Sequence, residues 1–499
     1  MDRKEYIQFD ATALAELVKK KEVSATELVK AAVSQMEKVN AQINGIAHDR
    51  IEKVIKEAKE NAYNHGPFAG VPVLLKDISQ AVKGEILTGG SKLLKEMISD
   101  HDSHFTRKFK EAGFLIMGHT STPEFALKNI TESELYGPTR NPWNTNHSPG
   151  GSSGGASAMI ASGVVPLAGA SDGGGSIRIP ASFTSLFGLK PTRGRTPVGP
   201  GIGRAWQGAA IDFVLSKTVR DSAAMLDLLK VNQPEAAFQA PLFADSYSEE
   251  MKSPFNKRLK IAFSTISPVG TPVTEDAKQA VEKTVKWLER EGNIVEEKDN
   301  GVDGIQLMRD YFIMNSGEMA TSIKQLEKAL SKKITADDVE VESWLLNVAG
   351  NSVSAIEYSE SLASWDIAAA HMAKLHETYD FYITPTTAFT APKIGELTFS
   401  NSEREKLIKE MEEIDKSEQQ ELIYEMFLPS LTYSPFTQLA NLTGQPAMSV
   451  PVHIAGDGMP VGVQVIAQKG KEDDLLKLAY QLEQSDLWIG MRGNPFFES

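Results

Sequence analysis

The sequence contains no cysteine, which excludes disulfide bonds, thiolate zinc sites and a cysteine nucleophile. It also has no run of the roughly 18 apolar residues that a membrane-spanning helix needs, so no membrane segment is expected. Acidic residues outnumber basic residues by 66 to 52, which gives a formal net charge of −14. An acidic chain is poorly suited to polyanions, so direct binding of nucleic acid is not expected.

Several sequence motifs with known chemistry are also missing. There is no G-x-x-x-x-G-K-[ST] phosphate loop and no dinucleotide-binding glycine motif after a strand, which argues against a non-enzymatic nucleotide or phosphate binder. None of the nine histidines has metal-ligand spacing on a convincing helix, and no metal is expected. Residues 1–6 are charged and lack the apolar centre of a signal peptide, which favours a cytoplasmic protein.

What the chain does contain is enough apolar material for a large core. Of its 499 residues, 41% are hydrophobic and 24% are charged, as in soluble globular proteins. This length allows two or three domains, or one large α/β domain. No internal repeat of fixed period is present.

Helix and strand patterns alternate along the chain, which predicts an α/β fold with a mixed central sheet flanked by helices. Ser24 and Glu27 form a capping-box pattern at the start of an amphipathic helix, and a second helix is expected over 50–62. Residues 401–427 are highly charged and are expected to form one exposed helix. Further helices are expected over 105–111 and 154–162 and after Thr274. Strands are expected over 71–75, 114–117, 164–170, 259–263, 294–295, 381–384, 447–452 and 461–466.

Two glycine-rich loops, at residues 149–155 and 172–180, each present one serine. The intervening residues are predicted to form a helix and then a strand. Since these two elements run in opposite directions and the strand is long enough to span the helix, Ser152 and Ser176 are expected at the same end of the sheet.

Ser176 is the candidate nucleophile. It follows three glycines and precedes a segment that begins a helix with proline in its first turn. The backbone N–H groups of Gly173, Gly174, Gly175 and Ser176 would then converge as an oxyanion hole. The alternative interpretation of this motif is a tight glycine turn with an incidental serine.

A serine hydroxyl needs a base within hydrogen-bonding reach. Ser152 can pass a proton on but cannot keep it. Lys76 directly follows the apolar strand 71–75, at the edge where α/β proteins place their sites. A buried lysine loses its charge readily and can serve as a general base, whereas a lysine that extends to water would have no such role.

Taken together, these motifs resemble the amidase signature family and, within it, enzymes of the 6-aminohexanoate cyclic-dimer hydrolase type. The resemblance covers nearly the whole chain. The segments that carry it are 70–77 (GVPVLLKD), 136–144, 150–155 (GGSSGG), 172–180 (DGGGSIRIP), 188–195 (GLKPTRGR), 384–386 and 441–447. The narrower likeness depends on 140–144, 179–181, 310–311 and 394–397.

The resemblance implies an amidase that needs no metal or cofactor and uses a Ser–cis-Ser–Lys triad. Ser176 matches the nucleophile and Lys76 matches the base. Ser152 matches the bridging serine, which follows a cis Gly151–Ser152 peptide. The supporting positions are matched by Asp172 and Arg178.

The resemblance also implies a single domain over residues 1–499 that acts on a small amide, with a homodimer as one option for its assembly. Its expected parts are an N-terminal helical region (1–66), the signature core (67–230), a surface linker (231–258) and the remainder of the sheet with its covering helices (259–499).

Two other enzymatic interpretations stay open at this point. The family signature also occurs in one of the subunits of tRNA-dependent amidotransferases. Residues 150–154 fit the G-x-S-x-G motif of α/β-hydrolases, with Ser152 as nucleophile and a histidine drawn from His371, His376 or His453. The substrate pocket is not predictable: its determinants are expected between residues 300 and 400, where Asn315, Trp344 and Trp365 cannot be placed.

Overall fold

The computed structural model describes residues 1–60 and 65–498. Within them, a mixed eleven-stranded sheet forms the centre of the molecule, and a separate two-stranded ribbon lies beside it. The strand order of the large sheet is β1 (Ile46–Asp49), β3 (Leu115–Thr120), β2 (Pro72–Lys76), β6 (Leu167–Asp172), β8 (Ile211–Ser216), β7 (Phe187–Lys190), β12 (Ala447–Ile454), β13 (Pro460–Ala467), β11 (Phe381–Pro385), β9 (Lys260–Phe263) and β10 (Ile294–Glu297). The ribbon pairs β4 (Glu132–Ser133) with β5 (Gly137–Pro138).

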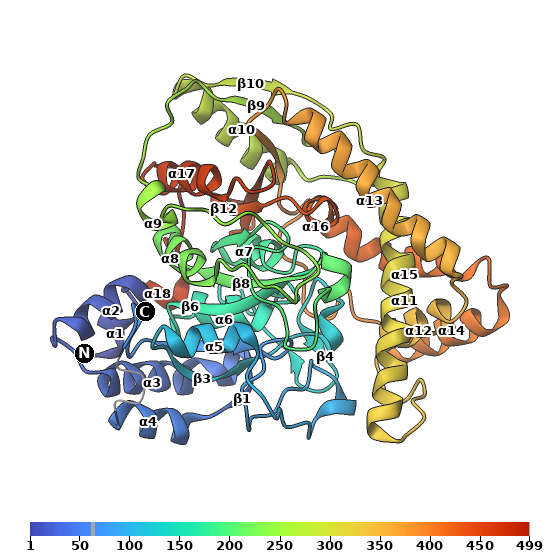
Figure 1. Cartoon of the computed structure of the whole chain (residues 1–499), viewed down its shortest axis with the longest axis horizontal. Helices are drawn as coiled ribbons and strands as arrows, with labels where there is room; N and C mark the ends of the chain where they lie inside the picture. The colour runs from blue at the N-terminus through green and yellow to red at the C-terminus, as the bar shows by residue number, and fades with distance from the viewer. Residues whose placement is uncertain (61–64, 499) are drawn as a thin grey trace.

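The strand directions explain why the sheet is mixed. Strands β3, β2 and β6 are parallel, and so are β11, β9 and β10 near the other edge. Antiparallel pairing joins these two parallel groups through β8, β7, β12 and β13. The predicted α/β class with a mixed central sheet is confirmed, and helices cover the sheet (Figure 1).

The helices fall into those that cover the sheet and those that stand beside it at the right of Figure 1. The first group comprises α1 (Arg3–Tyr6), α2 (Ala11–Lys19), α3 (Ala25–Ile43), α4 (Ile51–Lys59), α5 (His104–Glu111), α6 (Gly154–Ala161), α7 (Arg178–Thr184), α8 (Val219–Leu229), α9 (Tyr247–Glu250), α10 (Glu275–Arg290), α16 (Gln438–Thr443), α17 (Glu472–Glu483) and α18 (Pro495–Glu498). The second comprises α11 (Gly304–Leu330), α12 (Val341–Gly350), α13 (Ala355–Leu375), α14 (Asn401–Glu413) and α15 (Gln419–Tyr433). Short 3₁₀ turns are η1 (Lys92–Leu94), η2 (Glu124–Ala126) and η3 (Ala205–Gly208).

The elements before the first glycine loop agree with the sequence. The Ser24 side chain accepts from the Glu27 N–H, and the Glu27 carboxylate accepts from the Ser24 N–H, so the capping box is formed. Helix α4 ends at Lys59; the last two residues of the expected helix, 61 and 62, lie outside the described residues. All five residues of β2 are buried, as a central parallel strand requires.

The helices beside the sheet enclose a second hydrophobic core, formed mainly by α11, α12, α13 and α15. The prediction of one exposed helix over 401–427 is wrong: α14 and α15 are separate helices. Helix α15 buries one face, including Leu422, Ile423, Met426 and Phe427. The charged composition hid this face, because the buried side chains occupy only one stripe of the helix.

Other segments differ from expectation in detail. Strand β6 begins at Leu167 rather than at residue 164, since Pro166 lacks an N–H and Gly163 takes a φ of +77°. The polar segment 231–258 contains α9, which buries Tyr247. In the described part of the chain, every helix is too short or too polar to cross a bilayer.

Candidate active site

Lys76 lies at the carboxyl end of β2, and its side chain is buried. The Nζ atom is 2.7 Å from Ser152 Oγ and 2.9 Å from Ser171 Oγ. Two of the three residues singled out as the chemical centre are therefore in direct contact. Ser171 was not predicted; the signal that could have found it is its place on the strand that leads into the second glycine loop.

The environment of Lys76 favours an uncharged amine. Burial lowers the pKa of Lys76 to about 7, although the negative charges of Asp212 and Asp172 act in the opposite direction. A neutral amine can accept a proton, whereas an ammonium group has only donors to offer. Near neutral pH a substantial fraction of Lys76 is thus able to act as a base.

The first glycine loop is fixed by its neighbours. The Gly151–Ser152 peptide is cis, in agreement with what the resemblance implied. A Cβ on Gly151 would come within 2.5 Å of the Ile130 carbonyl oxygen, so no larger residue fits there. Thr122 Oγ1 donates to the Ser152 carbonyl oxygen at 3.0 Å. These contacts hold the Ser152 hydroxyl toward Lys76.

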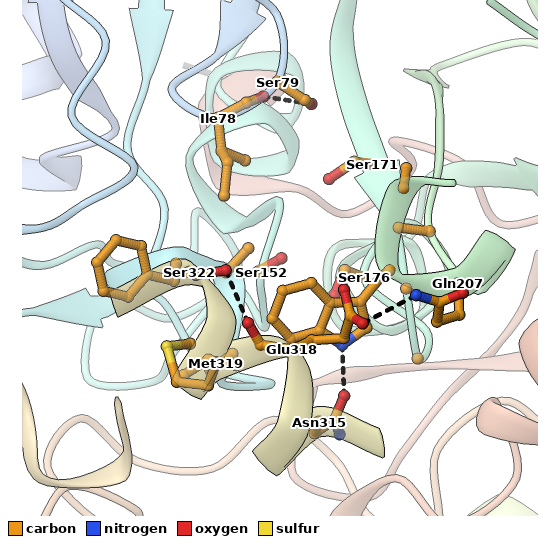
Figure 2. Close-up of a pocket in the computed structure, with 18 of the residues that line it drawn as sticks. Ile78, Ser79, Ser152, Ser171, Ser176, Gln207, Asn315, Glu318, Met319 and Ser322 are labelled. Atoms are coloured by element: carbon orange, nitrogen blue, oxygen red, sulfur yellow. Dashed lines mark hydrogen bonds between the residues drawn. The ribbon is translucent and has the colours of Figure 1, made fainter. Parts of the chain in front are cut away.

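The helix α6 and the strand β6 bring the second loop back to the first, as the sequence predicted. The Ser153 N–H donates to the Ser176 carbonyl oxygen at 3.3 Å, and Ser153 Oγ donates to the Ser171 carbonyl oxygen at 3.2 Å. Ser152 and Ser176 both line one cavity (Figure 2). No hydrogen bond joins their hydroxyl groups in the described structure.

Two of the three glycines before Ser176 are oriented by side chains that bind their carbonyl groups. Tyr311 Oη donates to the Gly173 carbonyl oxygen at 3.0 Å, and Thr437 Oγ1 donates to that of Gly174 at 2.6 Å. In a trans peptide the N–H points opposite to the C=O. The Tyr311 contact therefore turns the Gly174 N–H away from α11.

One of the four expected oxyanion donors is already in use. The Gly175 N–H donates to Asp172 Oδ1 at 2.7 Å, so the inclusion of Gly175 in the oxyanion hole is corrected. The N–H groups of Gly173, Gly174 and Ser176 donate to no other described residue. Gly175 has a φ of +130°, and a Cβ there would collide with the Thr437 side chain. Its role is to shape the loop.

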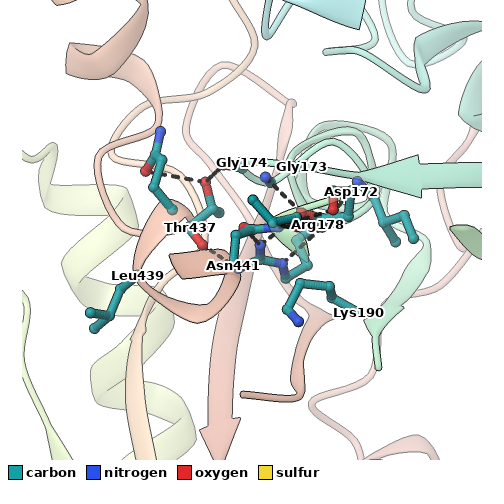
Figure 3. A network of polar contacts seen from close by, with 12 residues as sticks. Asp172, Gly173, Gly174, Arg178, Lys190, Thr437, Leu439 and Asn441 are labelled. Carbon is teal, nitrogen blue, oxygen red and sulfur yellow. Dashed lines mark hydrogen bonds and ion pairs between the residues drawn. The ribbon is translucent and has the colours of Figure 1, made fainter. Parts of the chain in front are cut away.

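Asp172 and Arg178, the predicted supporting pair, form a buried network behind the loop (Figure 3). Asp172 accepts from Arg178 Nη2 at 2.9 Å and Nε at 3.0 Å, and also from the Asn441 amide at 2.9 Å. Burial acts to raise the pKa of Asp172, but the charge and hydrogen bonds of Arg178 outweigh it and bring the pKa to about 2. Asp172 thus remains a carboxylate that fixes the nucleophile loop.

The cavity in front of the two serines has a volume of about 1030 Å³. Its far wall is one face of α11, joined by residues of α15 and of η3. Two hydrogen bonds connect η3 to α11: Trp206 Nε1 donates to Asn315 Oδ1, and Gln207 Nε2 donates to Glu318 Oε1 at 2.9 Å. The apolar part of the wall includes Phe125, Ile202, Phe312, Met319, Phe427 and Leu431.

Most of the remaining candidates from the sequence lie away from the cavity. Asn315 lines the cavity, whereas Trp344 and Trp365 belong to the second core. His453 Nε2 is 3.1 Å from Asp276, and no histidine among the described residues hydrogen-bonds to Ser152 or Ser176. No strand of the described chain leads directly into Ser152, so the α/β-hydrolase interpretation does not fit. In residues 1–60 and 65–498, no three acidic or histidine side chains are grouped to hold a metal ion.

Comparison with known proteins identifies the family. Residues 27–476 match the Amidase family. A lipoamidase from Enterococcus faecalis is 37% identical over 484 residues, which cover 96% of this chain and 64% of that protein. A 6-aminohexanoate-cyclic-dimer hydrolase from Paenarthrobacter ureafaciens is 34% identical over 491 residues, covering 97% of this chain and 96% of that protein.

The solved structures agree with the sequence match. A structure of 6-aminohexanoate cyclic dimer hydrolase superimposes with a TM-score of 0.89 at 34% identity, and covers 98% of this chain and 99% of that one. The match therefore extends over the sheet, both glycine loops and the helices beside them. The chain belongs to the amidase signature family and is a hydrolase of amide bonds.

Proposed function

We propose that the chain cleaves its amide substrate through an acyl-enzyme on Ser176, with Ser152 as proton relay and Lys76 as base. The observation that carries this proposal is the 2.7 Å contact between Lys76 Nζ and Ser152 Oγ, made by a buried lysine whose pKa is lowered to about 7. A serine hydroxyl becomes an effective nucleophile only when such a base can take its proton.

The acylation half-reaction begins as neutral Lys76 takes a proton from Ser152 and Ser152 takes one from Ser176. Ser176 Oγ attacks the amide carbon, and the carbonyl oxygen becomes an oxyanion. The C–N bond then breaks, and the proton on Lys76 returns through Ser152 to the leaving nitrogen. The products are a free amine and an ester on Ser176.

The deacylation half-reaction repeats these steps with water as the nucleophile. Water loses a proton toward Lys76 through Ser152 and attacks the ester carbon. The Ser176–acyl bond breaks, the proton returns to Ser176 Oγ, and the carboxylic acid is released. Each half-reaction leaves Lys76 neutral.

The oxyanion is proposed to be held by the N–H groups of Gly173, Gly174 and Ser176. Support comes from their lack of other acceptors among the described residues and from the Tyr311 bond that orients the Gly174 peptide. Donors that are fixed before the reaction stabilise the developing charge without reorganisation. The missing hydrogen bond between Ser152 and Ser176 is compatible with this mechanism, since catalytic hydrogen bonds often tighten only when substrate is bound.

The proposed substrate is an amide with an extended aliphatic or cyclic acyl group. The volume and the largely apolar wall of the cavity support this choice, since apolar surface gains free energy when it is buried. The similar proteins named as a lipoamidase and a 6-aminohexanoate-cyclic-dimer hydrolase favour the same class.

The test is a panel of acyl anilides from acetyl to dodecanoyl, with cyclic lactams, combined with mass spectrometry of the trapped protein. We expect the acyl mass on the peptide that contains Ser176, and kcat/KM that rises with chain length. An acyl group on Ser152 would contradict the assignment of the nucleophile. An isolated chain that cleaves no simple amide would favour the role in a tRNA-dependent amidotransferase instead.

A further inference from the structure

Asp212 is a carboxylate close to the chemical centre that the proposed mechanism does not use. It lies on β8 directly opposite Ser171 of β6, in an antiparallel pair. Residues paired in this way project their side chains from the same face of the sheet, with Cβ atoms about 5 Å apart. Because Ser171 Oγ accepts from Lys76 Nζ, this register brings the Asp212 carboxylate to the same side of the sheet as the amine, beyond the 4.0 Å of an ion pair. Asp212 also lines the cavity.

The Asp212 carboxylate is held in place by neutral donors. Its Oδ1 accepts from Ser79 Oγ at 2.7 Å and from Gln80 Nε2 at 3.1 Å. The same Gln80 side chain accepts from the Lys76 backbone N–H at 2.8 Å. Gln80 therefore ties the strand end that carries the lysine to the carboxylate.

The charged groups that act on Lys76 come from two neighbouring strands: Asp212 on β8 and Asp172 on β6. Asp172 is bound by Arg178 in a buried ion pair, so its charge is largely balanced. Asp212 has no cation within 4.0 Å in the described part of the chain. It is thus the carboxylate whose charge is left to act on the lysine.

We infer that Asp212 is a positioning residue that stabilises the ammonium group formed when Lys76 takes up the serine proton. The inference rests on the proposed function, because it needs Lys76 to be the base. A buried ammonium is costly unless an opposite charge lies near it. Asp212 supplies that charge while its distance from Lys76 keeps the amine free to contact Ser152.

The test is the pH profile of Asp212→Asn, which keeps the shape of the side chain and removes its charge. Without the negative charge Lys76 holds its proton less tightly, so the acid limb of kcat/KM moves to lower pH, by about one pH unit. The plateau falls about 10-fold to 100-fold, because the ammonium is less stabilised. KM changes little, since Asp212 acts on the proton rather than on the substrate.

The matched control is Asp221→Asn. Asp221 is also a buried carboxylate, but it accepts from the Ala11 and Thr12 N–H groups at the start of α2. This substitution is expected to lower stability and to leave the pH profile where it is. A second variant, Gln80→Leu, loosens the Asp212 carboxylate without removing it; we expect a shift of the same sign and smaller size. If the Asp212→Asn protein does not fold, Gln80→Leu serves as the test in its place.

A second readout avoids substrate binding altogether. The rate at which a fluorophosphonate labels Ser176 is measured from pH 5 to 9 in each variant. If the labelling rate of the Asp212→Asn protein has the same acid limb and plateau as the parent, the role of Asp212 is overturned. The proposed function still stands in that case if the Lys76→Met protein is inactive. A fully active Lys76→Met protein would instead overturn both the role of Asp212 and the proposed function.

Discussion

The two glycine loops and the helical wall that faces them across the cavity use their side chains in opposite ways. In the loops, polar groups bind mainly to one another: the buried Asp172 carboxylate accepts five hydrogen bonds from four residues. The wall formed by α11 and α15 turns both apolar side chains, such as Met319 and Leu431, and polar ones, such as Gln325 and Ser430, toward the open space of the cavity. This contrast suggests that the loops set the reaction and the wall sets the substrate.

Among substitutions that test this contrast between loops and wall, the largest loss of activity is expected at the nucleophile. Ser176→Ala should lower kcat/KM about 10⁴-fold or more, because no covalent intermediate can form. Single-turnover release of a chromogenic aniline measures this effect. Ser182→Ala, on the following helix α7, is the matched control and should stay within about threefold of the parent. A burst that survives in Ser176→Ala would show that another residue is acylated.

The next effect concerns the base and compares two buried lysines. Lys76→Met should lower kcat about 10³-fold, since general-base catalysis is lost. Lys190 is the internal control: burial and the positive charge of Arg178 lower its pKa to about 7 as well, but among the described residues its Nζ donates only to the Pro191 carbonyl oxygen. Lys190→Met should cost less than tenfold in kcat. Equal losses in both variants would mean that buried lysines matter here only for stability.

A smaller effect is expected where the two regions meet. Tyr311→Phe removes the hydrogen bond from α11 to the Gly173 carbonyl oxygen. The Gly174 N–H is then free to turn away from the proposed oxyanion position. We expect kcat to fall about tenfold, equal to about 1.4 kcal/mol, with KM nearly unchanged. Tyr424→Phe on α15, whose ring lies at Arg309, should change neither constant. A change confined to KM would assign Tyr311 to substrate binding instead.

The narrowest effect is expected within the wall, because it is limited to substrates with a long acyl chain. Met319→Trp should fill part of the cavity and lower kcat/KM for a dodecanoyl anilide about tenfold, because the larger ring takes the space of the acyl chain. The acetyl anilide is the internal control and should change less than threefold. Equal losses for both substrates would show that the wall also affects the chemical step.

The sequence was most informative where its signals are local. The apolar run that becomes β2 ends at Lys76, and the glycines around Ser152 and Ser176 allow those loops the tight, positive-φ turns that other residues disfavour. The alternation of helix and strand then brings the two serines together. These features need only neighbouring residues, so they were predictable.

The remaining features depend on residues that are distant in sequence. Asp212 meets Ser171 only through the register of β6 with β8, and Tyr311 reaches Gly173 across 138 positions. The commitment of the Gly175 N–H to Asp172 depends on loop geometry that glycine leaves open. The buried face of α15 could have been found from the helical spacing of its apolar residues, but its charged neighbours obscured that pattern.

The most direct test of the central claim is the pH dependence of the single-turnover acylation rate of Ser176. If neutral Lys76 is the base, the rate rises with pH through a midpoint near 7, the pKa to which burial lowers this lysine, and then reaches a plateau. The Lys76→Met protein should show no such rise. A wild-type rate that is flat from pH 5 to 9, or a Lys76→Met protein with the same midpoint, would contradict the account.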